Sequence, residues 1–137
     1  MRPVNQAQSL SSGILQFFET CVDSEQFDSR LDLAIREWAR RSEAVRAEVD
    51  RADNLRVKAL TDFFTRFNYP MPEAFIRARV IYYTQIGFYA LDVKESLGTR
   101  ISYTESYYLA FTGRQLDSVE AATFRVHIMQ KYGNNPA

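Results

Sequence analysis

The chain has 137 residues, of which 46% are hydrophobic and 25% are charged. This balance is typical of a folded domain and excludes a largely disordered chain. Its 17 basic and 17 acidic side chains cancel, so no net charge attracts a polyanion such as a nucleic acid. We expect a loose leader over residues 1–8 and a single domain over residues 9–137.

Cysteine usage and hydropathy indicate the compartment. Cys21 is the only cysteine, so no disulfide can form within the chain, which favours a reducing cytoplasm. No segment has the roughly 18 consecutive apolar residues of a membrane span. The N-terminus lacks the basic start and apolar run of a signal peptide. We therefore expect a cytoplasmic protein with no membrane partner.

The first half of the chain is predicted to form helices that begin at polar caps. Apolar residues recur at helical spacing over residues 9–21 and again over residues 28–41. The second of these helices is expected to turn four apolar residues toward the core: Leu31, Ala34, Ile35 and Trp38. Ser42 is a suitable N-cap for a short helix that reaches Val49, and a separate long helix is predicted over residues 50–67.

The second half is predicted to contain the longest helix. Pro72 opens a helix over residues 72–94, because a proline in the first turn loses no helical hydrogen bond, and residues 97–99 end it. Two further helices have marked ends: Ser102 and Asp117 as N-caps, each with Glu three residues later, and Gly113 and Gly133 as stops. No convincing alternating strand appears. The predicted fold class is all-α, a bundle of six to seven helices.

Residues that carry catalysis are scarce. His127 is the only histidine, so a histidine-based metal site lacks its ligands, and nothing near His127 in the sequence completes a Ser-His-Asp triad. Cys21 has no cysteine partner for a metal. No glycine-rich phosphate loop occurs, and the carboxylates alternate with Arg and Lys as on a solvated helix face. We therefore expect neither an enzyme nor a cofactor or metal.

Aromatic side chains are the most informative feature, with ten Phe and eight Tyr. They either fill a core or, because bulky rings pack imperfectly, leave a cavity between them. The cavity hypothesis names seven candidate ligand-binding residues: Phe18, Trp38, Phe63, Phe67, Phe75, Tyr82 and Gln85. No charged side chain falls on these predicted inward faces, so a small hydrophobic ligand is expected and a strongly charged one is disfavoured.

The helix over residues 72–94 has apolar residues on two sides, as expected of a helix that is covered by its own domain and by a partner. Gly87 lies in its middle, where glycine costs about 1 kcal/mol relative to Ala. One interpretation is a tolerated cost, and the other is the close approach of a second helix. The candidate dimer interface is one line of this helix: Ile76, Val80, Tyr83, Gly87 and Leu91.

The order of these segments resembles the C-terminal domain of TetR-family transcriptional regulators. The resemblance covers about residues 9–133 and rests on three segments: the Trp38-bearing segment, the charged stretch through Arg56 and the apolar helix after the proline turn. The family's helix-turn-helix domain has no counterpart in residues 1–28, so we expect no DNA binding by this chain alone.

The resemblance implies a cavity for a small hydrophobic effector, enclosed by the helices over 9–21, 28–41, 50–67 and 72–94. It also implies a homodimer joined through a four-helix bundle, and a role as the ligand-sensing domain of a repressor or an activator. A helical protein-interaction module without a small ligand remains the alternative, and an enzyme is a third, weaker one.

Overall fold

Seven helices and no strand are present in the computed structural model, which describes residues 8–23 and 28–133. Their bounds are α2 Leu10–Val22, α3 Ser29–Ala39, α4 Glu43–Arg66, α5 Glu73–Ala90, α6 Leu97–Ser102, α7 Thr104–Thr112 and α8 Ser118–Tyr132. The predicted all-α class is therefore confirmed. Apart from residue 8, the expected leader lies outside the described residues, as do the last four residues of the expected domain.

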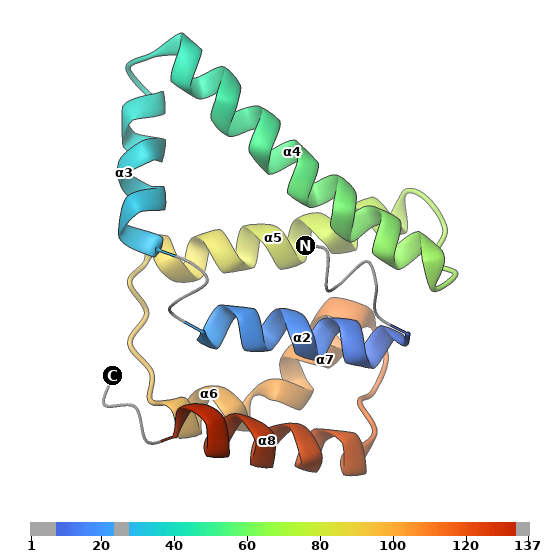
Figure 1. The fold of residues 1–137 in the computed structure, drawn as a ribbon. Helices are drawn as coiled ribbons and strands as arrows, with labels where there is room; N and C mark the ends of the chain where they lie inside the picture. The colour runs from blue at the N-terminus through green and yellow to red at the C-terminus, as the bar shows by residue number, and fades with distance from the viewer. Residues whose placement is uncertain (1–7, 24–27, 134–137) are drawn as a thin grey trace.

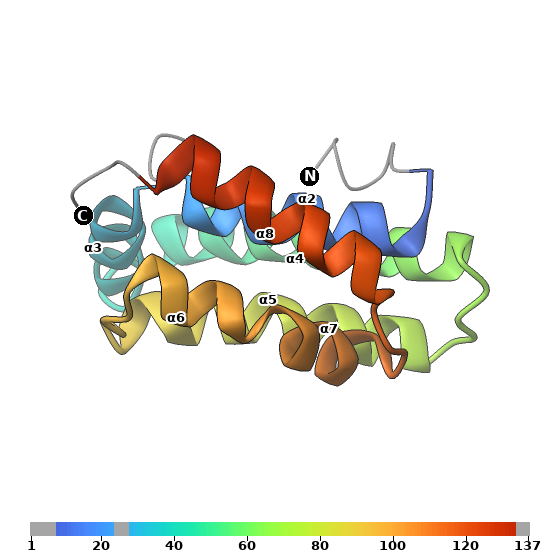
Figure 2. The same ribbon diagram turned by 90° about the horizontal axis from the view of Figure 1, so that it is seen from below.

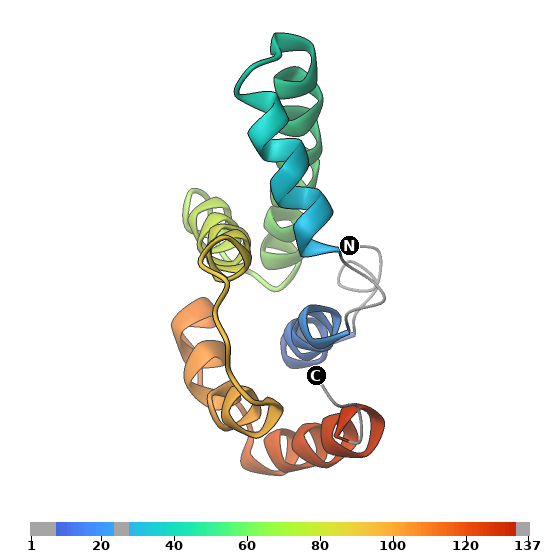
Figure 3. The ribbon, with the colours of Figure 1, turned by 90° about the vertical axis from the view of Figure 1, so that its left-hand side faces the viewer.

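The helices lie in two groups on either side of α2. Above it, α4 packs against α5 and α3, and the α3–α4 pair reaches away from the rest of the molecule (Figure 1). Below it, α6, α7 and α8 form the second group (Figure 3). Seen from below, α8 covers α2 while α6 and α7 cover α5 (Figure 2). Both α2 and α5 are thus covered on more than one side.

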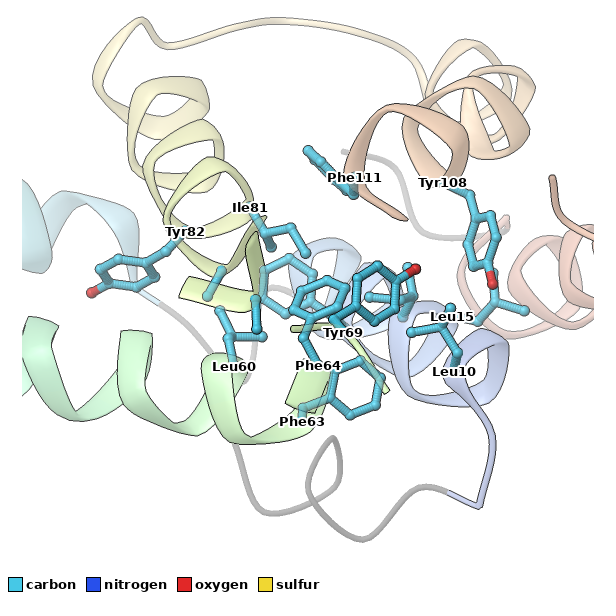
Figure 4. Packing of buried hydrophobic residues seen from close by; sticks show 14 of the residues in the cluster. Leu10, Leu15, Leu60, Phe63, Phe64, Tyr69, Ile81, Tyr82, Tyr108 and Phe111 are labelled. Carbon is cyan, nitrogen blue, oxygen red and sulfur yellow. The ribbon is translucent and has the colours of Figure 1, made fainter. Parts of the chain in front are cut away.

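The core gathers around the second half of α4. All of the buried residues of this helix lie in that half: Val57, Leu60, Thr61, Phe63 and Phe64. The Phe64 ring packs edge-on against Phe63 and Tyr69, with centroid distances of 5.5 and 5.0 Å. Figure 4 shows these rings among side chains from α2, α5 and α7. The edge-to-face contacts therefore hold the turn at Tyr69 against the end of α4, within the core that α4 shares with the other helices.

The predicted break within α4 does not occur. Ser42 caps the helix as predicted, since its side chain accepts a hydrogen bond from the Val45 amide. The helix then continues to Arg66, so the prediction of two separate helices was wrong. No glycine or proline interrupts it, and the Arg46–Asp50 ion pair spans the predicted break at 2.9 Å. Ion pairs four residues apart support a continuous helix.

The longest predicted helix ends early. Helix α5 stops at Ala90 rather than at residue 94, and Asp92 takes a left-handed conformation with φ 51°. Residues 97–99, predicted as a helix end, instead begin α6, which Ser96 caps through the Thr99 amide. Because an Asp can adopt left-handed backbone geometry at modest cost, this turn needs no glycine and left no pattern to detect.

The predicted caps of the last two helices have different outcomes. Asp117 caps α8 by accepting a hydrogen bond from the Glu120 amide, as predicted. Ser102 does not cap α7, because it is the last residue of α6 and its hydroxyl donates to the Thr99 carbonyl. The prediction for Ser102 was therefore wrong.

The C-terminal end of α7 is held by residues from two other segments. Gly113 ends the helix in the left-handed conformation, with φ 72°. The Tyr69 hydroxyl donates a hydrogen bond of 2.6 Å to the Thr112 carbonyl, and Arg77 donates to the Phe111 carbonyl at 3.2 Å. Carbonyls at a helix end lack partners within the helix, so these contacts satisfy them and fix α7 on α5.

Replacing Gly113 with Ala is expected to lower the free energy of unfolding by about 1–2 kcal/mol, because a left-handed backbone disfavours a Cβ atom. A Cβ atom would also lie 2.7 Å from Nη2 of Arg77. Urea unfolding measures the change. Gly98→Ala is the matched control, since a Cβ there meets nothing within 4 Å. Equal unfolding midpoints for the two variants would contradict the expectation.

Helix α3 turns its apolar face away from the core. Leu31 is 57% exposed and Trp38 is 61% exposed, so the predicted inward face of this helix was wrong. Helix α3 packs on α4 through another face, from which Arg36 reaches Asp53 on α4 with two hydrogen bonds of 2.8 Å. The amphipathic pattern was present, but the side of α3 that carries Asp32 and Arg36 is the one that faces α4.

No helix in the described ranges combines the length and the apolar character needed to cross a membrane.

Candidate ligand-binding site

An open cavity of about 110 Å³ lies where five helices meet. Its walls come from α2, α5, α6, α7 and α8. One water molecule needs only about 10–15 Å³ by the same kind of measure, so the space is larger than a solvent site. It has room for a single ring or a short alkyl chain, with an opening for the remainder of a larger molecule.

Aromatic side chains make up about half of the residues that line the cavity. The rings that line it are Phe17, Phe18, Phe88, Tyr89, Tyr103, Tyr107, Phe111 and Phe124. They pack at angles to one another, as in the Phe18–Phe111 pair at 6.0 Å and the Tyr107–Phe111 pair at 5.6 Å between centroids. Tilted rings present both faces and edges to the space between them. Such walls suit an apolar or aromatic ligand.

Polar atoms gather at one end of the cavity, near the end of α2. Arg100 donates a hydrogen bond of 3.4 Å to the Cys21 carbonyl, and its guanidinium lies 4.9 Å from the centre of the Phe88 ring. Gln85 lies 3.6 Å from the Cys21 sulfur and also hydrogen-bonds Tyr89. A cation at the last turn of a helix is favourable, because the carbonyls there carry partial negative charge.

The Cys21 thiol at this end is unreactive at neutral pH. Burial raises its pKa to about 12, and the nearby positive charge of Arg100 offsets only part of that effect. The nucleophilic form of cysteine is the thiolate, which is scarce so far below the pKa. Cys21 therefore contributes a small apolar wall, as a buried cysteine commonly does.

Two of the seven predicted ligand-binding residues, Phe18 and Gln85, line this cavity. The others lie elsewhere in the fold. Phe63 is buried in the α4 core, and Phe67 and Phe75 pack against the same cluster. Trp38 is exposed on α3. The structure thus brings a different set of rings together from the set predicted.

Tyr82 does not line the cavity and instead belongs to an ion-pair network. Its hydroxyl points away from the aromatic core toward α3 and α4, and donates a 2.6 Å hydrogen bond to Asp53 (Figure 4). Asp53 also accepts the two hydrogen bonds from Arg36, whose Nε atom donates to Asp32 at 2.8 Å. This network joins α3, α4 and α5.

The network lowers the pKa of Asp53. Burial alone would raise this pKa, but the hydrogen bonds from Arg36 and Tyr82 and the charge of Arg36 outweigh burial. The same pairing raises the pKa of Arg36. Both groups therefore stay charged at neutral pH, which holds the α3–α4 pair to α5.

Several lining residues were missed by the sequence-based prediction. Phe88 and Tyr89 end α5, while Tyr107, Phe111 and Phe124 come from the two C-terminal helices. The expectation of inward faces without charge was made for another set of residues, whereas this cavity is lined by two charged side chains, Arg100 and Glu95. Helix α6, which carries Arg100, has six residues and was not predicted, so no pattern placed this charge at the cavity.

The predicted dimer-interface line of α5 lies on its outer side. Ile76, Val80, Tyr83 and Leu91 are between 43% and 78% exposed. A Cβ atom at Gly87 would meet nothing within 4 Å in this chain, so no packing inside the protomer requires glycine there. The line is thus an apolar surface that the described residues leave uncovered.

Within residues 8–23 and 28–133, no group of three or more His, Cys, Asp or Glu side chains is arranged to hold a metal ion. Comparison of the chain with protein-family models, with curated proteins and with solved structures finds no match.

Proposed function

We propose that this chain is the ligand-sensing and dimerisation domain of a TetR-like transcriptional regulator, and that a small hydrophobic effector binds in the aromatic cavity. The observation that carries the proposal is the open, ring-lined space where five helices meet. A closely packed core would have left no space larger than a water molecule there. The effector acts in the cytoplasm, and this chain neither catalyses a reaction nor binds DNA alone.

The outer line of α5 supports the second half of the proposal. A cluster of exposed large apolar side chains on one helix face is typical of a surface that another chain covers. We propose that two copies of α5 pack there about a two-fold axis, together with a C-terminal helix of each copy.

The neutral single-ring compound 3-phenylpropionamide is a suitable probe of the cavity. At ten times its dissociation constant, a bound ligand raises the free energy of unfolding by about 1.4 kcal/mol, or roughly 5 °C in Tm. Thr84 is exposed and lines the cavity, so Thr84→Trp is expected to obstruct the opening and abolish most of this shift. A thermal-shift titration makes the measurement.

Thr65→Trp is the matched control, because Thr65 is also exposed on a helix but does not line the cavity. It is expected to keep the full shift. Native mass spectrometry of the purified chain adds a second readout, namely a small molecule retained during purification. If no probe of this size raises Tm and nothing is retained, the effector-binding proposal fails.

A protein-interaction module is the second candidate, and the exposed α5 line is the observation that favours it. In that case the chain is expected to remain monomeric by sedimentation and to bind no small molecule. A dimer that binds the phenylpropyl probe would exclude this alternative.

A further inference from the structure

Arg100 differs from the other half-buried arginines of the described residues. Arg36, Arg77 and Arg125 each pair with a carboxylate, at 2.8, 2.6 and 2.6 Å. Arg100 is half-buried as well, but among the described residues it has no carboxylate within ion-pair distance. Its polar contact is the 3.4 Å hydrogen bond to the Cys21 carbonyl, which is longer than a strong one.

The position of Arg100 is also unusual. It lines the cavity beside Cys21 and Phe88, so its charge lies at the edge of an apolar space. A guanidinium has five N–H donors in a planar fork that matches the two oxygens of a carboxylate. One weak contact and one ring leave most of this capacity for another group.

Glu95 also lines the cavity, so one negative and one positive side chain face the same space. The thiol of Cys21 responds to two influences, burial and the positive charge of Arg100. On the Tyr89 hydroxyl, whose pKa burial raises, the charge of Arg100 acts to lower the pKa and the charge of Asp32 acts to raise it. Arg100 is the charge that acts on the Cys21 thiol, and its guanidinium contacts the Cys21 carbonyl and the Phe88 ring at this end of the cavity.

We propose that the effector is a monocarboxylate with an apolar body, whose carboxylate pairs with Arg100 while the body lies among the aromatic side chains. This inference rests on the proposed effector-binding function and specifies its ligand class. A carboxylate that meets a guanidinium at the open edge keeps part of its hydration, so the cost of burying the charge is reduced.

Three probes that share the phenylpropyl group and differ in charge test which charge the cavity prefers. 3-Phenylpropionate carries a negative charge at neutral pH, 3-phenylpropionamide carries none and 3-phenylpropylamine carries a positive one. Isothermal titration of the native chain is expected to show the carboxylate binding about tenfold more tightly than the amide, with the amine weakest. Raising the salt concentration is expected to weaken the binding of the carboxylate probe and of neither other probe.

Arg100→Gln is expected to reduce the affinity for the carboxylate to that for the amide, while the affinity for the amide changes less than about threefold. Amide binding also reports that the variant cavity has folded. Arg79→Gln is the matched control, because Arg79 stacks on the Phe75 ring at 4.3 Å, as Arg100 stacks on Phe88, but lies outside the cavity. It is expected to change neither affinity.

The outcomes distinguish failure of the carboxylate inference from failure of the effector cavity itself. Equal affinities of the native chain for carboxylate and amide, or tightest binding of the amine, overturn the carboxylate inference and leave the effector cavity standing. If Arg100→Gln is unstable, the charge order and the salt dependence of the native chain decide the question. If none of the three probes binds, the effector cavity and the carboxylate inference fail together.

Discussion

Replacing Gly87 with Leu is expected to weaken self-association of the chain by about ten- to hundredfold. Gly87 lies in the last turn of α5, within the apolar line through which we propose that the helix packs against its copy. A leucine at a close helix contact costs roughly 1–3 kcal/mol, since the helices must move apart. Sedimentation equilibrium of the native and variant chains measures the change.

The substitution is expected to affect the dimer and not the fold of the single chain. A Cβ atom at Gly87 meets nothing within 4 Å, and leucine favours the helix by up to about 1 kcal/mol over glycine. The isolated chain is therefore expected to become slightly more stable while its dimer becomes weaker. Gly98→Leu adds the same side chain at another open glycine and is expected to leave the dimer unchanged.

Val80→Glu places a charge in the same line and is expected to give a monomer, since an unpaired carboxylate is costly in an apolar interface. A native chain that sediments as a monomer at tens of micromolar would refute the dimer.

Asp53→Ala is expected to lower the free energy of unfolding by about 2–3 kcal/mol. The substitution removes the acceptor of three hydrogen bonds, two from Arg36 and one from Tyr82. Hydrogen bonds to charged groups contribute roughly 1.5–3 kcal/mol each, but the partial exposure of this pair reduces the total. Urea unfolding at neutral pH is the measurement.

Asp50→Ala is the matched control on the same helix. Asp50 pairs with Arg46 at 2.9 Å, but both side chains are more than half exposed, so the expected loss is below about 0.5 kcal/mol. Similar losses for the two substitutions would show that the network contributes no more than a surface ion pair.

Acid is expected to remove the contribution of Asp53. Its pKa in the folded chain lies below the ordinary value of 3.8, so the carboxylate stabilises the fold at pH values above the unfolded pKa. That stabilisation is lost as the pH falls below about 4 and through the folded pKa. The difference in unfolding free energy between the native chain and Asp53→Asn is therefore expected to shrink below about pH 4. A constant difference down to pH 3 would exclude this role for Asp53.

Features set by neighbouring residues were accessible from the sequence. The caps at Ser42 and Asp117 and the stop at Gly113 depend on atoms within a few positions, and all three are present. Helical periodicity likewise located the cores of α2, α4 and α5. These are the features for which local chemistry decides the structure.

The facing of α3 and the composition of the cavity depend on distant residues. Periodicity identified an apolar side of α3, but it could not show that another side, which carries Arg36, would face Asp53 on α4. Phe18 and Gln85 were found because periodicity placed helices at these two positions, although α5 ends earlier than predicted. Arg100 was missed because a six-residue helix after a left-handed turn at Asp92 brings it to the cavity.

The one-sided burial of α4 has a consequence for local opening of the fold. Its first half, from Glu43 to Arg56, contains no buried residue and is held by α3, by exposed ion pairs and by the Asp53 network. Its second half belongs to the core. Segments with few buried contacts open at lower free energy than the global unfolding transition. Amide hydrogens before Val57 are therefore expected to exchange with solvent ahead of those in the rest of the same helix, so that one uninterrupted helix would span two levels of protection.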